Sequence, residues 1–246
     1  MIWFIIATLV AFFIKGLCGF ANTLIFNGIL SYTANNINIS PLEVGLGYPS
    51  NIILVWKERK SLNWKIWLPL TALVVAGSIP GIFLLKHTDA GLLKVIFGIA
   101  VIVIGVEMLF REMKSNRESS NRKPGGSKLV LVLIGIISGL LCGLYGVGAL
   151  LAAYVSRVAE NSHEFKANIC VVFVVENTIR IILYVATGIL TLSVLKQVVI
   201  LIPFMLAAVF LGMKSSSVLN EKIIKKIVII LLILSGIVLI INNIPG

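Results

Sequence analysis

The chain has 246 residues and a formal net charge of +11, and 59% of its residues are hydrophobic while 13% are charged. Its mean hydropathy is +1.06. This composition excludes a water-soluble domain, because only lipid could cover such a surface. We therefore expect an all-α polytopic membrane protein whose positive charge lies largely in cytoplasmic loops, which leaves no need for a nucleic-acid partner.

Eight apolar runs are long enough to enter or cross a hydrocarbon core of about 30 Å. In chain order they cover residues 2–30, 40–56, 66–85, 91–110, 129–155, 166–187, 193–212 and 223–242. The one long polar stretch divides them into two sets of four. The sequence thus predicts a first transmembrane repeat over 1–110, a linker over 111–128 and a second transmembrane repeat over 129–246.

The first run of each half is interrupted by a similar motif. Residues 15–22 read KGLCGFAN, and residues 141–148 read LCGLYGVG. Glycine costs a helix about 1 kcal/mol relative to alanine, so the two motifs predict helices that are broken inside the membrane. Broken helices at matching positions of two halves are typical of a transporter's binding site.

When the two halves are aligned, further residues coincide in the same order and with nearly constant spacing. Cys18-Gly19 falls on Cys142-Gly143, Asn51 on Asn177, Pro69 on Pro203, Lys94 on Lys225 and Gly105 on Gly236. A single match is common in apolar sequence, but this ordered series predicts an internal repeat.

Positive charges predict how the two repeats are oriented, since cytoplasmic loops are enriched in lysine and arginine. If all eight runs cross the membrane once, the two faces carry 11 and 8 positive residues. If 2–30 and 129–155 are instead hairpins that return to the side from which they entered, the count becomes 16 against 3. We therefore predict inverted repeats, with both glycine motifs near the midplane and a cytoplasmic linker.

The interrupted helices also predict an anion site. A helix that starts at a glycine break directs unsatisfied N–H groups and the positive end of its dipole at a ligand. Glycines let the backbone approach that ligand, cysteines are weak S–H donors, and asparagines add neutral donors. The candidates of these types, with the tyrosine inside the second motif, are Cys18, Asn22, Asn51, Cys142, Gly143, Tyr145, Gly146, Gly148 and Asn177. Close helix crossings use the same small residues, and this alternative stays open.

Charged residues inside the apolar runs are few. Arg180 and Glu176 share one helix face at i, i+4 spacing: Arg180 would attract the anion, and Glu176 would compensate it or carry a coupled proton. A purely structural ion pair is the alternative. Lys15 either faces the anion or extends to water. Glu43 is interpreted as a carboxylate at a helix N-terminus and Glu107 as half of an interfacial pair, so neither is assigned to the site.

Nothing in the sequence predicts an enzyme, a metal centre or a cofactor. His87 and His163 fall in predicted loops on opposite faces, which leaves no paired histidines for haem or for a metal. There is no P-loop, and the only aspartate, Asp89, lies at a membrane edge. We therefore expect a protein that binds and moves a ligand rather than one that transforms it.

Taken together, these features resemble the sulfite exporter TauE/SafE family. The positions that carry the resemblance are Gly16, Cys18, Gly19, Phe20 and Asn22 in the first motif, Gly143, Gly146 and Gly148 in the second, and Pro69 with Gly77 in the third run. The resemblance implies a permease for sulfur-containing or organic anions coupled to an ion gradient, and it adds Gly16, Gly19 and Phe20 to the candidate site. Ala21 departs from the pattern, because a glycine is expected there, and it should stiffen the backbone at the turn of the first hairpin.

Two functional hypotheses follow. The first is a secondary transporter in a prokaryotic plasma membrane, which carries a small anion such as sulfite, thiosulfate or an organosulfonate by alternating access around a midplane site. The second is a non-transporting membrane sensor or an auxiliary anion-binding subunit. Import or export, a coupling proton or sodium ion, and a monomer or a homodimer stay open at this stage.

Overall fold

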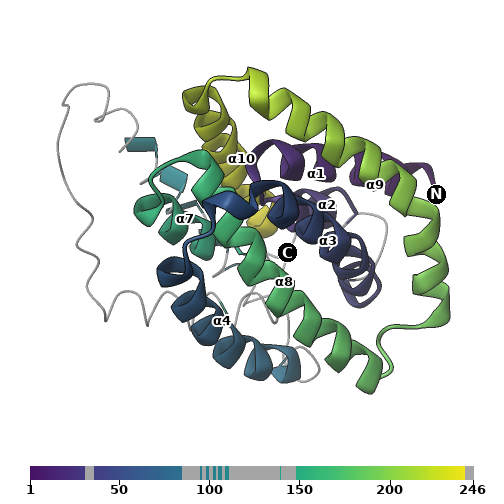
Figure 1. Cartoon of the computed structure of the whole chain (residues 1–246). Coiled ribbons are helices and arrows are strands. Elements are labelled where there is room, and N and C mark those ends of the chain that lie inside the picture. The colour runs from purple at the N-terminus through teal and green to yellow at the C-terminus, as the bar shows by residue number, and fades with distance from the viewer. Residues whose placement is uncertain are drawn as a thin grey trace.

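The computed structural model describes residues 1–30, 36–84 and 148–241, with isolated positions between 95 and 139. Every element in this part of the chain is helical, which confirms the predicted all-α class (Figure 1). In chain order the elements are α1 (Ile2–Cys18), α2 (Asn22–Leu30), α3 (Asn36–Glu58), the 3-10 helix η1 (Arg59–Ser61), α4 (Trp64–Leu84), α7 (Ala149–Val158), α8 (Ser162–Ala186), α9 (Leu192–Val218) and α10 (Glu221–Ile241). The predicted linker over 111–128 lies outside the described residues.

Most described helices coincide with predicted apolar runs. The second, third, sixth and eighth runs become α3, α4, α8 and α10, with each boundary within four residues of the prediction. Among the described helices, α8 and α9 are long and apolar enough to cross a membrane. Their 25 and 27 residues extend about 38 and 40 Å at 1.5 Å per residue. Val199, Phe210 and Leu211 of α9 are each more than half exposed, as lipid-facing side chains are.

The first apolar run is broken at the predicted motif. α1 ends at Cys18, and the following Gly19 has a left-handed φ of 87° while its N–H donates to the Lys15 carbonyl oxygen at 2.6 Å. Ala21 also has a positive φ, 72°, in the region that favours glycine, so the missing glycine leaves local backbone strain of about 1 kcal/mol. α2 then begins at Asn22 and packs against α1.

The second motif lies mostly outside the described residues. Its last residue, Gly148, is the N-cap of α7, so a helix does begin where the motif ends. A Cβ added to Gly148 would collide with the ring of Phe173 on α8. The glycine therefore permits the start of α7 to approach α8 closely.

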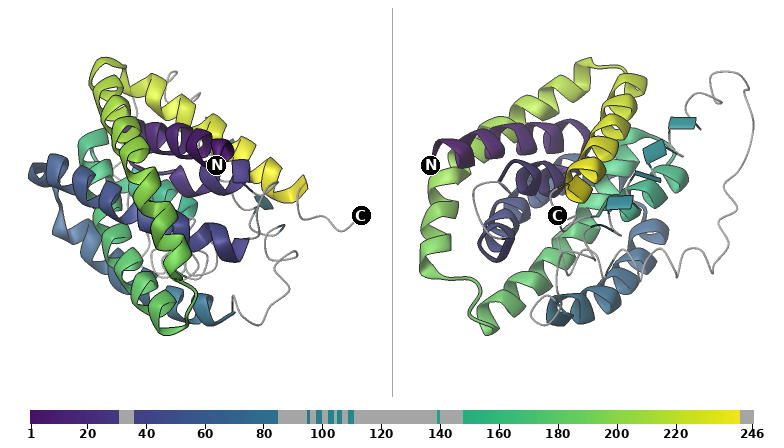
Figure 2. Two further views of the ribbon diagram at one scale, coloured as in Figure 1. Left: turned by 90° about the vertical axis from the view of Figure 1, so that its right-hand side faces the viewer. Right: turned by 180° about the vertical axis from the view of Figure 1, so that it is seen from behind.

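Among the described helices, α1 and α9 form the most extensive pair, and Figures 1 and 2 place them side by side. A Cβ added to Gly16 would collide with the backbone oxygen of Val209, and one added to Gly212 would collide with that of Phe13. These glycines let the two backbones approach at van der Waals contact, as small residues do in membrane helix crossings. For Gly16, the alternative of a packing role is therefore the one that the geometry supports.

A group of polar side chains joins the connection after α3 to the beginning of α8. Asn63 Nδ2 donates to Glu164 Oε1 at 2.9 Å, and the Asn63 backbone N–H donates to Asn168 Oδ1 at 3.0 Å. His163 Nδ1 lies 2.8 Å from Glu58 Oε2. We call Glu58, Asn63, His163, Glu164 and Asn168 the loop cluster. His163 lies in the first turn of α8 and not in a loop as predicted, because the Asn161 side chain caps the helix by accepting from the Glu164 N–H.

Candidate functional site

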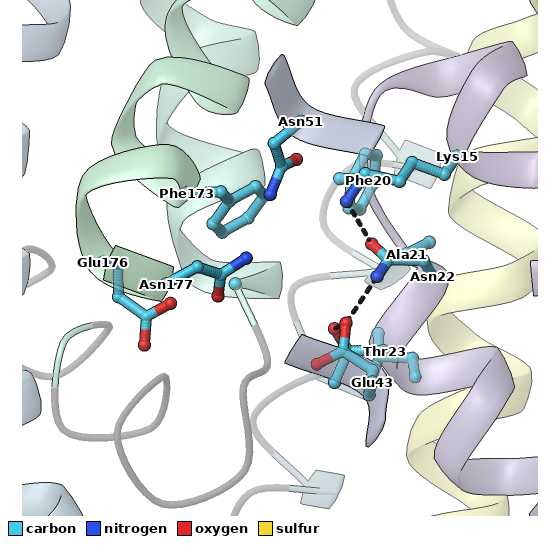
Figure 3. Close-up of a pocket in the computed structure, with 12 residues that line it drawn as sticks. Lys15, Phe20, Ala21, Asn22, Thr23, Glu43, Asn51, Phe173, Glu176 and Asn177 are labelled. Atoms are coloured by element: carbon cyan, nitrogen blue, oxygen red, sulfur yellow. Dashed lines mark hydrogen bonds between the residues drawn. The ribbon is translucent and has the colours of Figure 1, made fainter. Parts of the chain in front are cut away.

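A buried pocket lies beside the break between α1 and α2. Its lining comes from the break itself, from the middle of α3, from the start of α7 and from α8 (Figure 3). The lining residues are Lys15, Phe20, Ala21, Asn22, Thr23, Leu24, Glu43, Asn51, Gly148, Phe173, Glu176 and Asn177. The predicted candidates Lys15, Phe20, Asn22, Asn51 and, from the second half, Gly148, Glu176 and Asn177 thus line one cavity.

Lys15 is the cation of the pocket. Its side chain is only 1% exposed, so it does not extend to water, and its Nζ donates to Asn22 Oδ1 at 2.9 Å. The rings of Phe12 and Phe173 lie 6.0 and 5.9 Å from the ammonium, at the outer limit of cation–π contact. No carboxylate of the described residues forms an ion pair with Lys15, which leaves its charge directed at the pocket.

Glu43 faces Lys15 across the Asn22 amide. Asn22 Nδ2 donates to Glu43 Oε1 at 2.5 Å, and Thr23 Oγ1 donates to the same oxygen at 2.7 Å (Figure 3). The prediction that Glu43 sits at a helix N-terminus was wrong, because α3 begins two turns earlier at Asn36. The second apolar run was expected to begin at residue 40, but α3 begins before it, in polar sequence that carries no hydropathy signal.

Arg180 lies behind the pocket and is not among its lining residues. Its Nε is 3.5 Å from Glu176 Oε1, and its Nη1 is 3.9 Å from Glu43 Oε2. Nη2 donates to Ser40 Oγ at 2.8 Å and to Tyr184 OH at 3.0 Å. The guanidinium therefore stands between two carboxylates and links α8 to α3; the structural alternative expected only the one with Glu176.

Asn51 is the least satisfied polar residue of the pocket. It is 1% exposed, and neither its Oδ1 nor its Nδ2 has a hydrogen-bond partner within the described part of the chain. A buried amide without partners costs about 1–3 kcal/mol, and both amide atoms of Asn51 are therefore available to a polar ligand in the pocket. The aligned Asn177 lies on the facing helix α8 and lines the same pocket.

Gly47 is a pocket neighbour that sequence reasoning missed. A Cβ added there would lie 3.1 Å from Glu43 Oε1 and 3.6 Å from both Asn22 Nδ2 and Asn177 Nδ2. The bare backbone of α3 therefore leaves room for these three polar side chains to gather. Its only sequence signal was a glycine inside an apolar helix, which packing explains equally well.

Five residues that line the pocket were not among the predicted candidates: Ala21, Thr23, Leu24, Glu43 and Phe173. Glu43 was discounted by its presumed place at a helix end, although a charge inside an apolar run is itself a signal of a functional site. Thr23 and Phe173 carried no signal, since threonine and phenylalanine are ordinary in membrane helices. Only the fold brings them to the break.

Several predicted candidates do not line the pocket. Cys18 Sγ donates to the Ile14 carbonyl oxygen at 2.8 Å within α1, and Gly16 and Gly19 lie against α9 and Lys166. Within the described residues, no group of three or more His, Cys, Asp or Glu could hold a metal ion. Four candidates lie outside the described residues: Cys142, Gly143, Tyr145 and Gly146.

A chain whose described elements are all helical, with apolar outer faces, a broken first segment and charged residues around a buried pocket, has the features of a membrane permease. The family model of the sulfite exporter TauE/SafE matches residues 4–239, nearly the whole chain. The chain therefore belongs to the sulfite exporter TauE/SafE family, whose members are integral membrane permeases of sulfur-containing anions. No curated protein and no solved structure matches it significantly.

Proposed function

We propose that this protein is a secondary transporter that carries one small sulfur-containing oxyanion, such as sulfite, thiosulfate or an organosulfonate, by alternating access around the pocket at the first helix break. The observation that supports this best is Lys15, a buried cation with no carboxylate ion-pair partner among the described residues. A buried charge is costly unless it is paired, so a site of this kind favours an anionic ligand.

The surroundings of Lys15 suit an oxyanion. The start of α2 contributes the positive end of a helix dipole, and Asn22, Asn51 and Asn177 contribute amide donors. Glu176 lies on the opposite side of the pocket, where its Oε1 is 3.5 Å from Arg180 Nε but accepts no hydrogen bond from the described residues. We assign to Glu176 the charge compensation of the anion, by a coupled proton or sodium ion.

The loop cluster supports the hairpin topology. If every apolar run crossed the membrane once, the connection after α3 and the start of α8 would lie on opposite faces. In the structure Asn63 and Glu164 of these two segments share a hydrogen bond, and so do Glu58 and His163. With single crossings of the third and fourth runs, the two segments lie on one face only if the fifth run returns to the side from which it entered. We therefore propose that the fifth run is a re-entrant hairpin, and we extend this to the first run because it is broken between α1 and α2.

Helix packing supports inversion of the repeats. α4 packs on α8 as α9 packs on α3, so the third segment of each half contacts the second segment of the other. A Cβ on Gly105 would meet Ile233, and one on Gly236 would meet Ile102. Gly105 and Gly236 are aligned positions, so the two contacts exchange when one half is laid on the other. The later residue of the fourth segment, Gly105, meets the earlier residue of the eighth, Ile233, and the earlier one, Ile102, meets the later one, Gly236. The two segments are therefore antiparallel, as inverted repeats require.

Topology can be tested by labelling. Single cysteines placed at Ser156 and at Asn116 in the linker should react with a membrane-impermeant reagent from the same side. Reaction from opposite sides would contradict the hairpins.

The transport function is tested by flux. Purified protein in proteoliposomes should accumulate labelled sulfite, thiosulfate or sulfoacetate under an imposed proton or sodium gradient, and the flux should saturate. Empty liposomes give the background. Saturable anion binding without flux under either gradient would contradict transport and would favour a sensor or an auxiliary anion-binding subunit.

A further inference from the structure

Glu43 occupies the place in the pocket where an anion is expected. Asn22 and Thr23 are the first two residues of α2, and both side chains donate to Glu43 Oε1, at 2.5 and 2.7 Å. The first turn of a helix favours negative charge. A carboxylate of the protein itself therefore satisfies donors that an oxyanion would otherwise use.

The same pocket retains capacity for a second polar ligand. Asn51 is 1% exposed and has no partner for either amide atom among the described residues. Lys15 has one hydrogen-bond acceptor in that part of the chain, Asn22 Oδ1, although an ammonium carries three donors. Glu43 alone therefore does not complete the site.

A second cation lies within reach of Glu43. Its Oε2 is 3.9 Å from Arg180 Nη1, which is too long for a hydrogen bond. Arg180 Nη2, in contrast, already donates hydrogen bonds to Ser40 and Tyr184. A small rotation of the Glu43 side chain toward α8 would exchange neutral donors for a guanidinium.

We propose that Glu43 is a resident counter-anion that the transported oxyanion displaces. The incoming anion takes the Asn22 and Thr23 donors together with the Lys15 ammonium, and Glu43 turns to Arg180. The donors thereby accommodate an oxyanion such as a sulfite or sulfonate group, whose oxygens can accept from an amide and a hydroxyl at once as the Glu43 carboxylate does. Arg180 acts on the anion through Glu43 and is a positioning residue. This inference rests on the proposed anion transport.

The decisive measurement is anion affinity in the Glu43→Gln variant. Glutamine keeps the size of the side chain and an oxygen that accepts from Asn22 and Thr23, but removes the competing charge. Titration calorimetry of the purified full chain with sulfite, thiosulfate and sulfoacetate should give binding at least about tenfold tighter than the wild type, because like charges this close repel by more than about 1.4 kcal/mol. Glu58→Gln, the same change in the loop cluster, should leave the affinity unaltered.

Arg180 supplies the second test. Arg180→Gln should weaken anion binding, because Glu43 loses its alternative partner, and adding Glu43→Gln to that variant should restore it. If Arg180 contacted the anion directly, the second change would not restore binding. This pair also decides the matter if Glu43→Gln alone does not fold.

The outcomes separate the two levels of the proposal. Wild-type binding with equal or weaker binding by Glu43→Gln overturns the displacement of Glu43 and leaves anion transport standing. The absence of binding of all three anions by the wild type and by Glu43→Gln overturns both.

Discussion

The pocket and the loop cluster both gather polar side chains from distant parts of the chain, but they satisfy them differently. In the loop cluster each side chain meets a complementary one, as Asn63 meets Glu164 and Asn168. In the pocket, Lys15 and Glu43 are held apart by the Asn22 amide, and Asn51 has no partner in the described part of the chain. Complete pairing of buried polar groups stabilises a fold, whereas buried polar atoms without a partner cost stability and are typical of a binding site.

The largest effect is expected at Lys15. Lys15→Gln removes the only cation that lines the pocket among the described residues, and it should lower anion affinity by about 100-fold, or about 2.7 kcal/mol. Calorimetric titration of the purified protein with sulfite measures this. Lys65→Gln, which removes an exposed cation beside Trp64, is the matched control and should bind like the wild type. Equal affinities for all three proteins would contradict the role of Lys15.

In the loop cluster the expected loss is one of stability. Asn168→Leu fills the same space but removes the acceptor of the Asn63 N–H, and it should lower the stability of the protein by about 1–2 kcal/mol. Thermal unfolding in detergent should therefore begin at a lower temperature, while anion affinity stays unchanged. A weaker affinity at unchanged stability would show that the two regions are not distinct.

Asn51→Leu is the same substitution in the pocket and should have the opposite profile. Since the Asn51 amide has no partner among the described residues, its removal should leave the unfolding temperature unchanged or raise it. Anion affinity should fall by about tenfold, the equivalent of one good hydrogen bond to a charged group. A destabilised variant with normal affinity would assign Asn51 to the fold instead of the site.

The smallest effect is expected at His163, whose side chain is 64% exposed. His163→Gln removes the contact with Glu58 at the rim of the loop cluster, and exposed pairs of this kind contribute less than about 1 kcal/mol. The unfolding temperature should shift slightly and transport should not change. A loss of flux at normal stability would mean that the loop cluster takes part in transport and does not only stabilise the fold.

Prediction from the sequence succeeded where the signal was local. The position of the first helix break follows from glycines in an apolar run, and Gly19 does take a conformation that favours glycine. Lys15, Asn22, Asn51 and Asn177 were picked out by residue type, and they line one pocket, while their binding of a ligand stays a prediction. Gly16 was also picked out, but it lies at the crossing with α9. The prediction failed there because a binding glycine and a packing glycine have the same sequence signal.

The sequence by itself determined the membrane class, the family, the break and most of the chemistry at the break, because hydropathy, charge and glycine act over a few neighbouring residues. Only the tertiary structure decided the partners. Asn22 and Glu43 are 21 residues apart, and Ser40 and Arg180 are 140 apart. Contacts over such separations depend on how whole helices pack, and hydropathy does not specify packing between segments that are all apolar.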